Sequence, residues 1–229
     1  MARPQGQPPD PHRLRPVRTG RPAARGGGAA AQAGCRALHQ LAQEGQAVRI
    51  IAGEWRGRRI DAPRGEATRP TADRTRETLF NMLTSRLGSF EGLRVADLFA
   101  GSGALGLEAL SRGAAHCLFV EQDRAALDTI RANIRSLDAG ARASVEAGSV
   151  MGLRAAREPL DLILLDPPYG TGAGAVALDR MLRLGWIGEA TWIALETGRD
   201  EEVSVKGLAV ETERTLGKGK GKLTLLTAS

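Results

Sequence analysis

The sequence contains little cysteine, few aromatic residues and no long apolar run. Its two cysteines, Cys35 and Cys117, lie far apart and form neither a CxxC pair nor a cysteine–histidine spacing. We therefore expect no disulfide framework and no bound metal. No stretch approaches the ~18 uninterrupted apolar residues of a membrane span, which excludes an integral membrane protein. This cysteine usage fits a reducing compartment, so we expect a cytoplasmic protein.

The first 47 residues contain no Phe, Tyr or Trp, and only Asp10 and Glu44 oppose their seven arginines. Alanine, glycine, proline and glutamine dominate the rest. Such a composition cannot bury enough apolar surface to offset the entropy of ordering, so we predict a disordered extension over 1–47. The segment has no apolar stretch typical of a secretory signal, and its lack of serine argues against a transit peptide. A nonspecific RNA-binding tail is the alternative to a dispensable extension.

The segment 48–88 is predicted to form a small basic module. Apolar residues in 48–51 and 58–60 flank turn glycines, a pattern typical of a β-hairpin. Thr71 then caps a predicted helix whose apolar residues recur every three or four positions. Residues 48–86 carry nine basic and five acidic residues. This module therefore has the positive charge that a phosphate-facing surface needs.

Over 89–229 the pattern changes to strands that alternate with helices. The strands are expected at 93–99, 117–121, 143–147, 160–165 and 191–196, and the helices at 104–112, 123–137 and 175–184. This alternation predicts an α/β fold with a doubly wound, mostly parallel sheet. Segments 208–215 and 223–227, joined by a glycine-rich loop, predict a C-terminal antiparallel hairpin.

A glycine-rich loop with the sequence GSGALG occupies residues 101–106, between the first strand and the first helix of this domain. It matches GxGxxG, whose glycines let N–H groups at a helix N-terminus approach a ligand closely. Asp97, four residues before the loop, would repel a pyrophosphate but can accept hydrogen bonds from an ammonium group or ordered water. The alternative is a structural role in which Asp97 caps the turn.

Glu121 ends the second strand, about twenty residues after the glycine loop. A carboxylate there can accept both hydroxyl protons of a cofactor ribose. The alternative is that Glu121 caps the helix that begins near Asp123. Ser149 and Val150 follow the third strand, where a polar side chain or a backbone N–H could meet an adenine edge.

The tetrapeptide DPPY at 166–169 follows the fourth strand and is the most specific motif in the chain. Its two prolines stiffen the turn and remove two N–H donors, which leaves carbonyl oxygens and the Asp166 carboxylate facing the crevice beyond the strands. An acceptor-only cluster suits an exocyclic amine, because it stabilises the positive charge that develops when nitrogen attacks an electrophile. Tyr169 could stack on the base that carries this amine. The alternative is a rigid turn with a packed tyrosine.

Together these motifs resemble the RsmD family of class I S-adenosylmethionine-dependent methyltransferases, which methylate the N2 amine of a guanine in bacterial 16S ribosomal RNA. The resemblance extends over 48–58, 69–81 and 97–114, and includes Glu121 and the DPPY motif. It implies a Rossmann-like class I methyltransferase sheet with S-adenosylmethionine as cofactor. It also implies 16S rRNA, or a small-subunit ribonucleoprotein particle, as the partner of a monomeric enzyme.

The resemblance further assigns roles to single residues. The cofactor would be held by Asp97, Phe99, Ala100, Gly101, Ser102, Gly103, Glu121, Gln122, Ser149 and Val150. The guanine amine would meet the catalytic turn Asp166, Pro167, Pro168 and Tyr169. RNA would contact Arg49, Trp55, Arg56, Arg58, Arg69, Thr71, Arg74 and Arg76. Ser149 departs from the acidic or amide residue that related methyltransferases often carry.

Three other functions compete with this hypothesis. A DNA adenine or protein glutamine methylase would use the same acceptor turn. An NAD-dependent dehydrogenase would use the glycine loop, but it explains neither Asp97 nor the DPPY motif. A noncatalytic RNA-binding protein would need only the basic module and would have no use for the acceptor turn.

Overall fold

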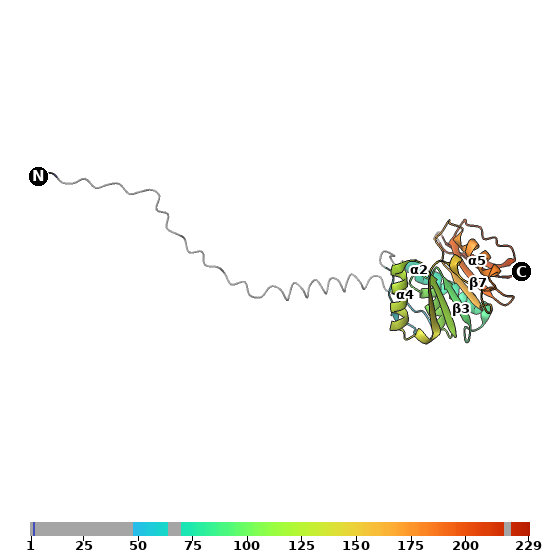
Figure 1. Ribbon diagram of the computed structural model, residues 1–229, viewed down its shortest axis with the longest axis horizontal. Coiled ribbons are helices and arrows are strands. Elements are labelled where there is room, and N and C mark those ends of the chain that lie inside the picture. The colour runs from blue at the N-terminus through green and yellow to red at the C-terminus, as the bar shows by residue number, and fades with distance from the viewer. Residues whose placement is uncertain (1, 3–47, 64–69, 218–220) are drawn as a thin grey trace. The chain divides into compact units, whose positions relative to one another are not determined.

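The structure is a computed structural model that describes residue 2 and residues 48–63, 70–217 and 221–229. Backbone contacts divide the chain into two units, Met1–Ala42 and Gln43–Ser229. Every described residue except residue 2 belongs to the second unit. The extension predicted over 1–47 thus lies, apart from residue 2, outside the described residues. Figure 1 shows the second unit as a twisted sheet with helices packed on its faces.

A seven-stranded sheet in the order β5-β4-β3-β6-β7-β9-β8 forms the centre of this unit. Its strands are β3 (Arg94–Leu98), β4 (His116–Glu121), β5 (Ala143–Ala147), β6 (Leu162–Leu165), β7 (Trp192–Gly198), β8 (Leu208–Thr215) and β9 (Gly221–Ala228). The five strands from β5 to β7 pair in parallel, whereas β9 runs antiparallel to β7 and β8. The predicted α/β sheet with a C-terminal antiparallel hairpin is confirmed.

Helices cover both faces of the sheet. They are α2 (Pro70–Leu87), α3 (Ala104–Ser111), α4 (Arg124–Ser136) and α5 (Ala173–Arg183), with the short 3-10 turns η1 (Gly140–Arg142) and η2 (Val150–Gly152). Successive side chains of a strand point to opposite faces. Val95 of β3 accordingly packs in a cluster with α2, α3 and α4, whereas Ala96 packs in a second cluster with α5. Burial on both faces explains why β6 reads as the unbroken apolar run Leu-Ile-Leu-Leu.

The N-terminal hairpin is also present. Strand β1 (Val48–Arg49) pairs antiparallel with β2 (Arg59–Ile60). Ile50, Trp55 and Ile60 are buried in the same cluster as residues of α2, α3 and α4. One hydrophobic cluster thus spans the domain boundary proposed between residues 88 and 89, and that boundary stays a prediction.

The first helix begins at Pro70, one residue before the predicted cap. Thr71 therefore lies inside the first turn of α2 rather than at its N-cap, which corrects the expected start. Proline suits the first helical position, because the N–H it lacks would have no partner within the helix.

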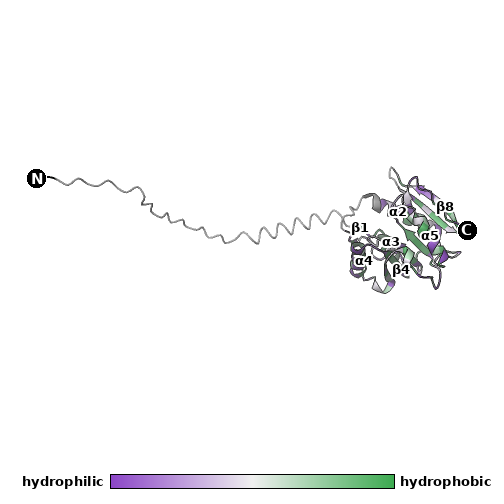
Figure 2. Cartoon of the chain, turned by 45° about the horizontal axis from the view of Figure 1, so that its top comes forward, coloured by the Kyte–Doolittle hydropathy of each residue, from purple (hydrophilic) through white to green (hydrophobic). Residues whose placement is uncertain are grey.

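Figure 2 shows green, hydrophobic residues along the strands of the sheet and purple, hydrophilic residues on outer surfaces such as that of α4. This distribution agrees with the two apolar clusters that flank the sheet. Among the described residues, no helix has both the length and the apolar character needed to cross a bilayer.

Candidate active site

The strand order reverses between β3 and β6, which lie side by side. From β3 the chain continues through α3 to β4 on one side, and from β6 it continues through α5 to β7 on the other. Such a switch point leaves a crevice at the carboxyl ends of the two strands, where open α/β sheets bind ligands. The glycine loop follows β3 at this edge, and Asp166 follows β6.

The glycine loop is held close to the sheet. Phe99 has a φ of 60°, a left-handed conformation that a bulky residue adopts only under constraint from its surroundings. Gly106 packs so tightly that a Cβ would overlap the Phe119 ring and lie 2.6 Å from the Cys117 Sγ. The third glycine of the motif therefore permits the close packing of α3 on β4.

Asp97 lies beneath this loop with a side chain that is 1% exposed. Its Oδ2 accepts a hydrogen bond from the Gly106 N–H at 2.8 Å. Burial raises the pKa of Asp97 well above its usual range; the Gly106 bond opposes this, and the nearby charges of Asp166 and Glu121 add to it. The hydrogen bond supports the alternative in which Asp97 ties the turn, and a contact between Asp97 and the cofactor stays a prediction.

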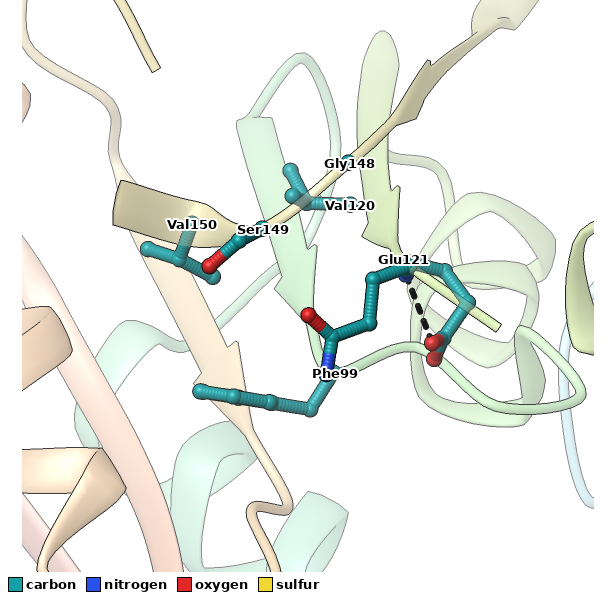
Figure 3. A pocket seen from close by; sticks show the side chains of 7 residues that line it. Phe99, Val120, Glu121, Gly148, Ser149 and Val150 are labelled. Carbon is teal, nitrogen blue, oxygen red and sulfur yellow. Dashed lines mark hydrogen bonds between the residues drawn. The ribbon is translucent and has the colours of Figure 1, made fainter. Parts of the chain in front are cut away.

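A pocket lies beside the glycine loop, at the ends of β4 and β5. Its lining consists of Phe99, Val120, Glu121, Gln122, Gly148, Ser149 and Val150. Figure 3 shows the side chains of Phe99, Glu121, Ser149 and Val150 gathered around it. The structure thus brings together five of the predicted cofactor residues. Val120 and Gly148 are additions that their position beside predicted residues could have indicated.

The Glu121 carboxylate accepts three backbone N–H groups. Its Oε2 accepts from Gly101 at 2.9 Å, and its Oε1 accepts from Gln122 at 2.7 Å and Asp123 at 2.8 Å. The helix-capping role considered for Glu121 belongs to Asp123, whose Oδ1 accepts the Ala126 N–H at 2.9 Å. Glu121 therefore joins the glycine loop to the end of β4 at the rim of the pocket.

The other predicted cofactor residues do not line this pocket. Ala100 is buried, and its N–H donates to the Val120 carbonyl at 3.2 Å. The Ser102 carbonyl accepts a hydrogen bond from Asn133 Nδ2 at 2.9 Å, and the Gly103 N–H donates to the Ala100 carbonyl at 2.7 Å. These residues give the loop its shape.

The DPPY turn extends from the end of β6 with Asp166, Pro168 and Tyr169 exposed and Pro167 buried. The Pro168 carbonyl accepts the Thr171 hydroxyl at 2.7 Å, so this oxygen has a partner within the turn. Tyr169 is 46% exposed and its hydroxyl donates to Glu196 Oε1. The alternative of a fully packed tyrosine does not fit this exposure.

Only some of the residues predicted to contact RNA are exposed on the basic module. Arg49, Arg56, Arg58 and Arg74 are exposed. Arg69 lies outside the described residues, and Thr71 lies within the first turn of α2.

Two residues predicted to contact RNA are instead buried. The Arg76 side chain is 5% exposed, and its Nη2 donates to the Arg49 carbonyl at 2.5 Å and to Asp73 at 3.0 Å. Trp55 is 4% exposed, and the guanidinium of Arg142 lies 4.8 Å from its ring centroid. Both side chains hold the module together, which corrects the expectation that they face RNA.

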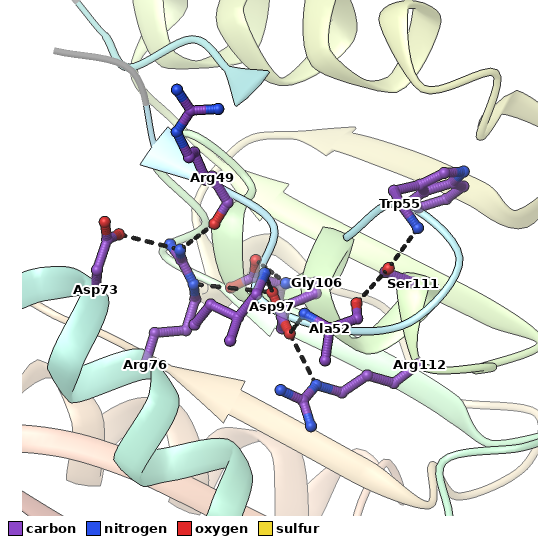
Figure 4. Close-up of polar contacts among 11 residues, drawn as sticks. Arg49, Ala52, Trp55, Asp73, Arg76, Asp97, Gly106, Ser111 and Arg112 are labelled. Atoms are coloured by element: carbon purple, nitrogen blue, oxygen red, sulfur yellow. Dashed lines mark hydrogen bonds and ion pairs between the residues drawn. The ribbon is translucent and has the colours of Figure 1, made fainter. Parts of the chain in front are cut away.

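Buried polar groups of α3 attach the module to the sheet, as Figure 4 shows for Ser111 and its neighbours. The fully buried Glu108 accepts the N–H groups of Ile51 at 2.7 Å and Ala52 at 3.0 Å. The Ser111 hydroxyl donates to the Ala52 carbonyl at 2.6 Å. A Cβ at Gly53 would overlap the Ser111 carbonyl oxygen, so only glycine permits this approach. These contacts fix the basic module against α3.

Sequence reasoning missed Glu108 and Ser111, because their partners are backbone groups more than fifty positions away. It also missed Glu196, a half-buried residue near the carboxyl end of β7, and Glu201, which follows that strand. A carboxylate at the carboxyl end of a parallel strand is the signal that identified Glu121 and Asp166. The same signal could have identified Glu196.

The sheet order and the glycine loop, with the DPPY turn at the same edge of the sheet, are those of a Rossmann-like methyltransferase. Magnesium protoporphyrin IX methyltransferase of Synechocystis, solved with SAM bound, has this fold at a TM-score of 0.53 and 10% identity, over 72% of this chain and 87% of that one. Residues 48–226 match the family described as Conserved hypothetical protein 95, which is the RsmD family, and the chain belongs to it.

A curated protein and a solved structure, both from Escherichia coli, support this membership. Ribosomal RNA small subunit methyltransferase D of strain K12 is 39% identical over 150 residues, which cover 66% of this chain and 74% of that protein. The solved structure of the protein yhhF has a TM-score of 0.68 and 34% identity, and the match covers 80% of this chain and 98% of that one.

Proposed function

We propose that the protein transfers a methyl group from S-adenosylmethionine to the exocyclic N2 amine of a guanine in 16S rRNA of the small ribosomal subunit. The observation that carries this proposal is the acceptor turn 166–169 at the end of β6, beside the loop that follows β3. A donor site and an acceptor site thus share one edge of the sheet. The rRNA methyltransferase name of the Escherichia coli relative supports RNA as the substrate.

The pocket residues fit S-adenosylmethionine, which supplies an electrophilic methyl group when bound. A carboxylate has about four acceptor positions, and three at Glu121 are used by backbone N–H groups. Of these three N–H groups only that of Gly101 bonds to Oε2, so Oε2 keeps one acceptor position for a ribose hydroxyl. Phe99 and Val150 supply apolar surface for an adenine, and the Ser149 hydroxyl lies at the same rim.

The acceptor turn then orients the amine. The Asp166 carboxylate accepts a hydrogen bond from the N2 amine and draws the nitrogen lone pair out of conjugation with the ring. As the N–C bond forms and the S–C bond breaks, Asp166 stabilises the charge on nitrogen, and the extra proton leaves to water. Tyr169 offers an exposed ring on which a guanine extruded from its stack can lie.

The exposed arginines of the basic module provide the contact to the RNA backbone. Arg49, Arg56, Arg58 and Arg74 are the described members of this surface. Because Glu108 and Ser111 fix the module against α3, these cations keep a constant position relative to the glycine loop. Phosphate contacts of this kind set the register of the RNA and leave base recognition to the turn.

The deciding experiment incubates the full chain with methyl-labelled S-adenosylmethionine and small-subunit particles that lack the mark, and then maps the label. Label at a guanine N2 of 16S rRNA supports the proposal. Label on another base, on DNA adenine or on protein glutamine contradicts the substrate. RNA binding without any transfer indicates a noncatalytic protein. Asp166→Ala serves as the inactive control.

A further inference from the structure

We propose that Glu196 and Glu201 are positioning residues that hold the acceptor turn in its working geometry, Glu196 through the hydroxyl of Tyr169 and Glu201 through the backbone that follows it. The inference rests on the proposed function for its catalytic consequence. Its structural part stands on contacts that can be measured without any methyl transfer.

Glu196 lies on β7, the parallel neighbour of β6. Its Oε1 accepts the Tyr169 hydroxyl across the gap between the two strand ends. A hydrogen bond to a carboxylate is among the stronger polar contacts in proteins, so it restricts the rotamers of the Tyr169 side chain. The bond fixes one end of the ring, and Tyr169 as a whole remains 46% exposed, which leaves surface for a base.

The surroundings of Glu196 strengthen this contact. Its side chain is half-buried, and desolvation raises its pKa while the Tyr169 hydrogen bond lowers it. The phenol therefore helps to stabilise the ionised carboxylate, which in turn binds the phenol. Gly221 of β9 packs beside the pair, because a Cβ there would lie 3.0 Å from the Tyr169 hydroxyl and 3.2 Å from Glu196 Oε1. The pair thus sits in a narrow space at the strand ends.

Glu201 follows β7 and reaches back to the loop behind Tyr169. Its Oε2 accepts the N–H of Gly170 at 2.9 Å and of Gly198 at 3.3 Å, and its Oε1 accepts the N–H of Gly172 at 3.3 Å. Gly172 is the N-cap of α5, where a negative charge is favourable. One carboxylate therefore joins the end of β7 to both sides of the loop between the turn and α5.

The two carboxylates act on opposite ends of one short segment. Glu196 fixes the tip of the Tyr169 side chain, and Glu201 fixes the two glycine amides that follow it. Since these glycines have φ values of 71° and 67° and no side chains of their own, the loop depends on outside partners for its shape. Loss of either carboxylate is expected to misalign the base more than the cofactor, whose pocket lies at β4 and β5.

The first test uses the fact that Tyr169 is the only tyrosine in the chain. Protein labelled with carbon-13 at tyrosine Cζ gives one resonance, which reports on the phenol alone. We expect Glu196→Gln to move this resonance toward that of free tyrosine, and Glu202→Gln to leave it in place. Glu202 is exposed and adjacent to Glu201, so it provides the same change of charge as a control. An unmoved resonance in Glu196→Gln overturns the pairing, whether or not the protein methylates RNA.

The second test measures turnover on small-subunit particles. Glu196→Gln and Glu201→Gln are each expected to lower kcat about tenfold with cofactor KM unchanged, because one charged hydrogen bond is worth roughly a factor of ten. Tyr169→Phe combined with Glu196→Gln should be no slower than Tyr169→Phe alone, since Tyr169→Phe removes the hydrogen bond that Glu196→Gln weakens. Glu202→Gln should match the parent. Normal kcat in both variants, or a multiplied defect in the double variant, overturns the inference.

A third measurement separates positioning from general loss of stability. Amide hydrogen exchange at Gly170 and Gly172 should accelerate in Glu201→Gln, while the amides of β3 and β4 keep their protection. Faster exchange throughout the sheet would mean that Glu201 only stabilises the fold, and would overturn its positioning role. If the parent protein transfers no methyl group, the proposed function fails, while the resonance and exchange results still decide the contacts.

Discussion

The Asn133 side chain pairs with both backbone polar atoms of Asp61: its Oδ1 accepts the Asp61 N–H at 2.8 Å and its Nδ2 donates to the Asp61 carbonyl at 2.9 Å. The same Nδ2 donates to the Ser102 carbonyl at 2.9 Å, and the side chain is 1% exposed. One buried amide on α4 therefore joins the basic module to the glycine loop.

Asn133→Asp should destabilise the protein by about 2 kcal/mol, because it replaces a buried donor with a negatively charged acceptor that faces two carbonyl oxygens. Denaturant unfolding of parent and variant measures the difference. Asn133→Gln, which keeps both functional groups on a longer side chain, tests whether distance also matters. Asp128→Asn, on an exposed part of the same helix, should change stability by less than about 0.5 kcal/mol. Equal stability of parent and Asn133→Asp would contradict the role of the amide.

Glu121→Ala should weaken S-adenosylmethionine binding by about 1 to 3 kcal/mol, since it removes the carboxylate proposed for the ribose and releases the Gly101 N–H. Isothermal titration calorimetry measures the affinity. Glu146→Ala, at an exposed position of β5, is the control and should bind as the parent does. Unchanged affinity in Glu121→Ala, or tighter binding of NAD than of S-adenosylmethionine, would refute the cofactor assignment.

Stability should depend on pH through Asp97. Because burial raises the pKa of Asp97 in the folded state above its value in the unfolded chain, the folded state holds the proton more tightly. The free energy of unfolding should therefore fall as pH rises from about 4, the ordinary Asp pKa, and level off above the raised pKa.

Asp97→Asn removes this titration and keeps an oxygen that can accept the Gly106 N–H. The stability of this variant relative to the parent should increase with pH over the same window. Urea unfolding of both proteins at a series of pH values tests the sign. A constant difference between the two proteins would show that Asp97 titrates alike in the folded and unfolded chain.

The sequence predicts the sheet of this protein better than it predicts the contacts that attach the hairpin to it. The strands predicted at 143–147 and 208–215 agree with the structure residue for residue, although both are edge strands without a buried residue, because turn glycines mark their ends. The strand predicted at 160–165 is present as the buried β6, because an unbroken apolar run is typical of a central parallel strand. Glu121 and Asp166 were found because they end such strands. The prediction that Arg76 faces RNA is wrong because the sequence does not show its burial. Its partners are Asp73, Glu108 and the Arg49 carbonyl, and only Asp73 is near in sequence. Charge along the chain cannot distinguish a buried arginine from an exposed one.

Deletion of residues 1–46 should leave the fold and the methylated nucleotide unchanged. The composition of residues 1–47 predicts a segment that contributes charge but no hydrophobic core. Loss of seven arginines should lower RNA affinity at low salt, because each phosphate contact adds to the salt dependence. Circular dichroism and label mapping on the truncated chain test both statements. A truncated chain that fails to fold, or that methylates another nucleotide, would contradict them.

Substitutions in the acceptor turn should impair catalysis, whereas substitutions in the basic module should impair RNA binding. Asp166→Ala is expected to abolish turnover with little change in RNA affinity, because it removes the carboxylate proposed to stabilise charge on the amine. Tyr169→Ala should be less severe, since it removes stacking worth about 1 to 3 kcal/mol. Tyr169→Phe should be milder than Tyr169→Ala, because a phenyl ring also stacks.

Arg74→Ala should show the opposite pattern, because Arg74 is an exposed cation of the module and lies away from the cofactor pocket. RNA should bind more weakly and with a shallower salt dependence, while cofactor affinity stays normal. Arg183→Ala, an exposed arginine on α5 at the other face of the sheet, is the matched control and should bind RNA as the parent does. All variants are to be compared on the same small-subunit particles. Near-normal turnover in Asp166→Ala would refute the acceptor-turn mechanism. Equal losses of RNA affinity in Arg74→Ala and Arg183→Ala would show that RNA responds to the net charge of the protein and not to a specific contact with the basic module.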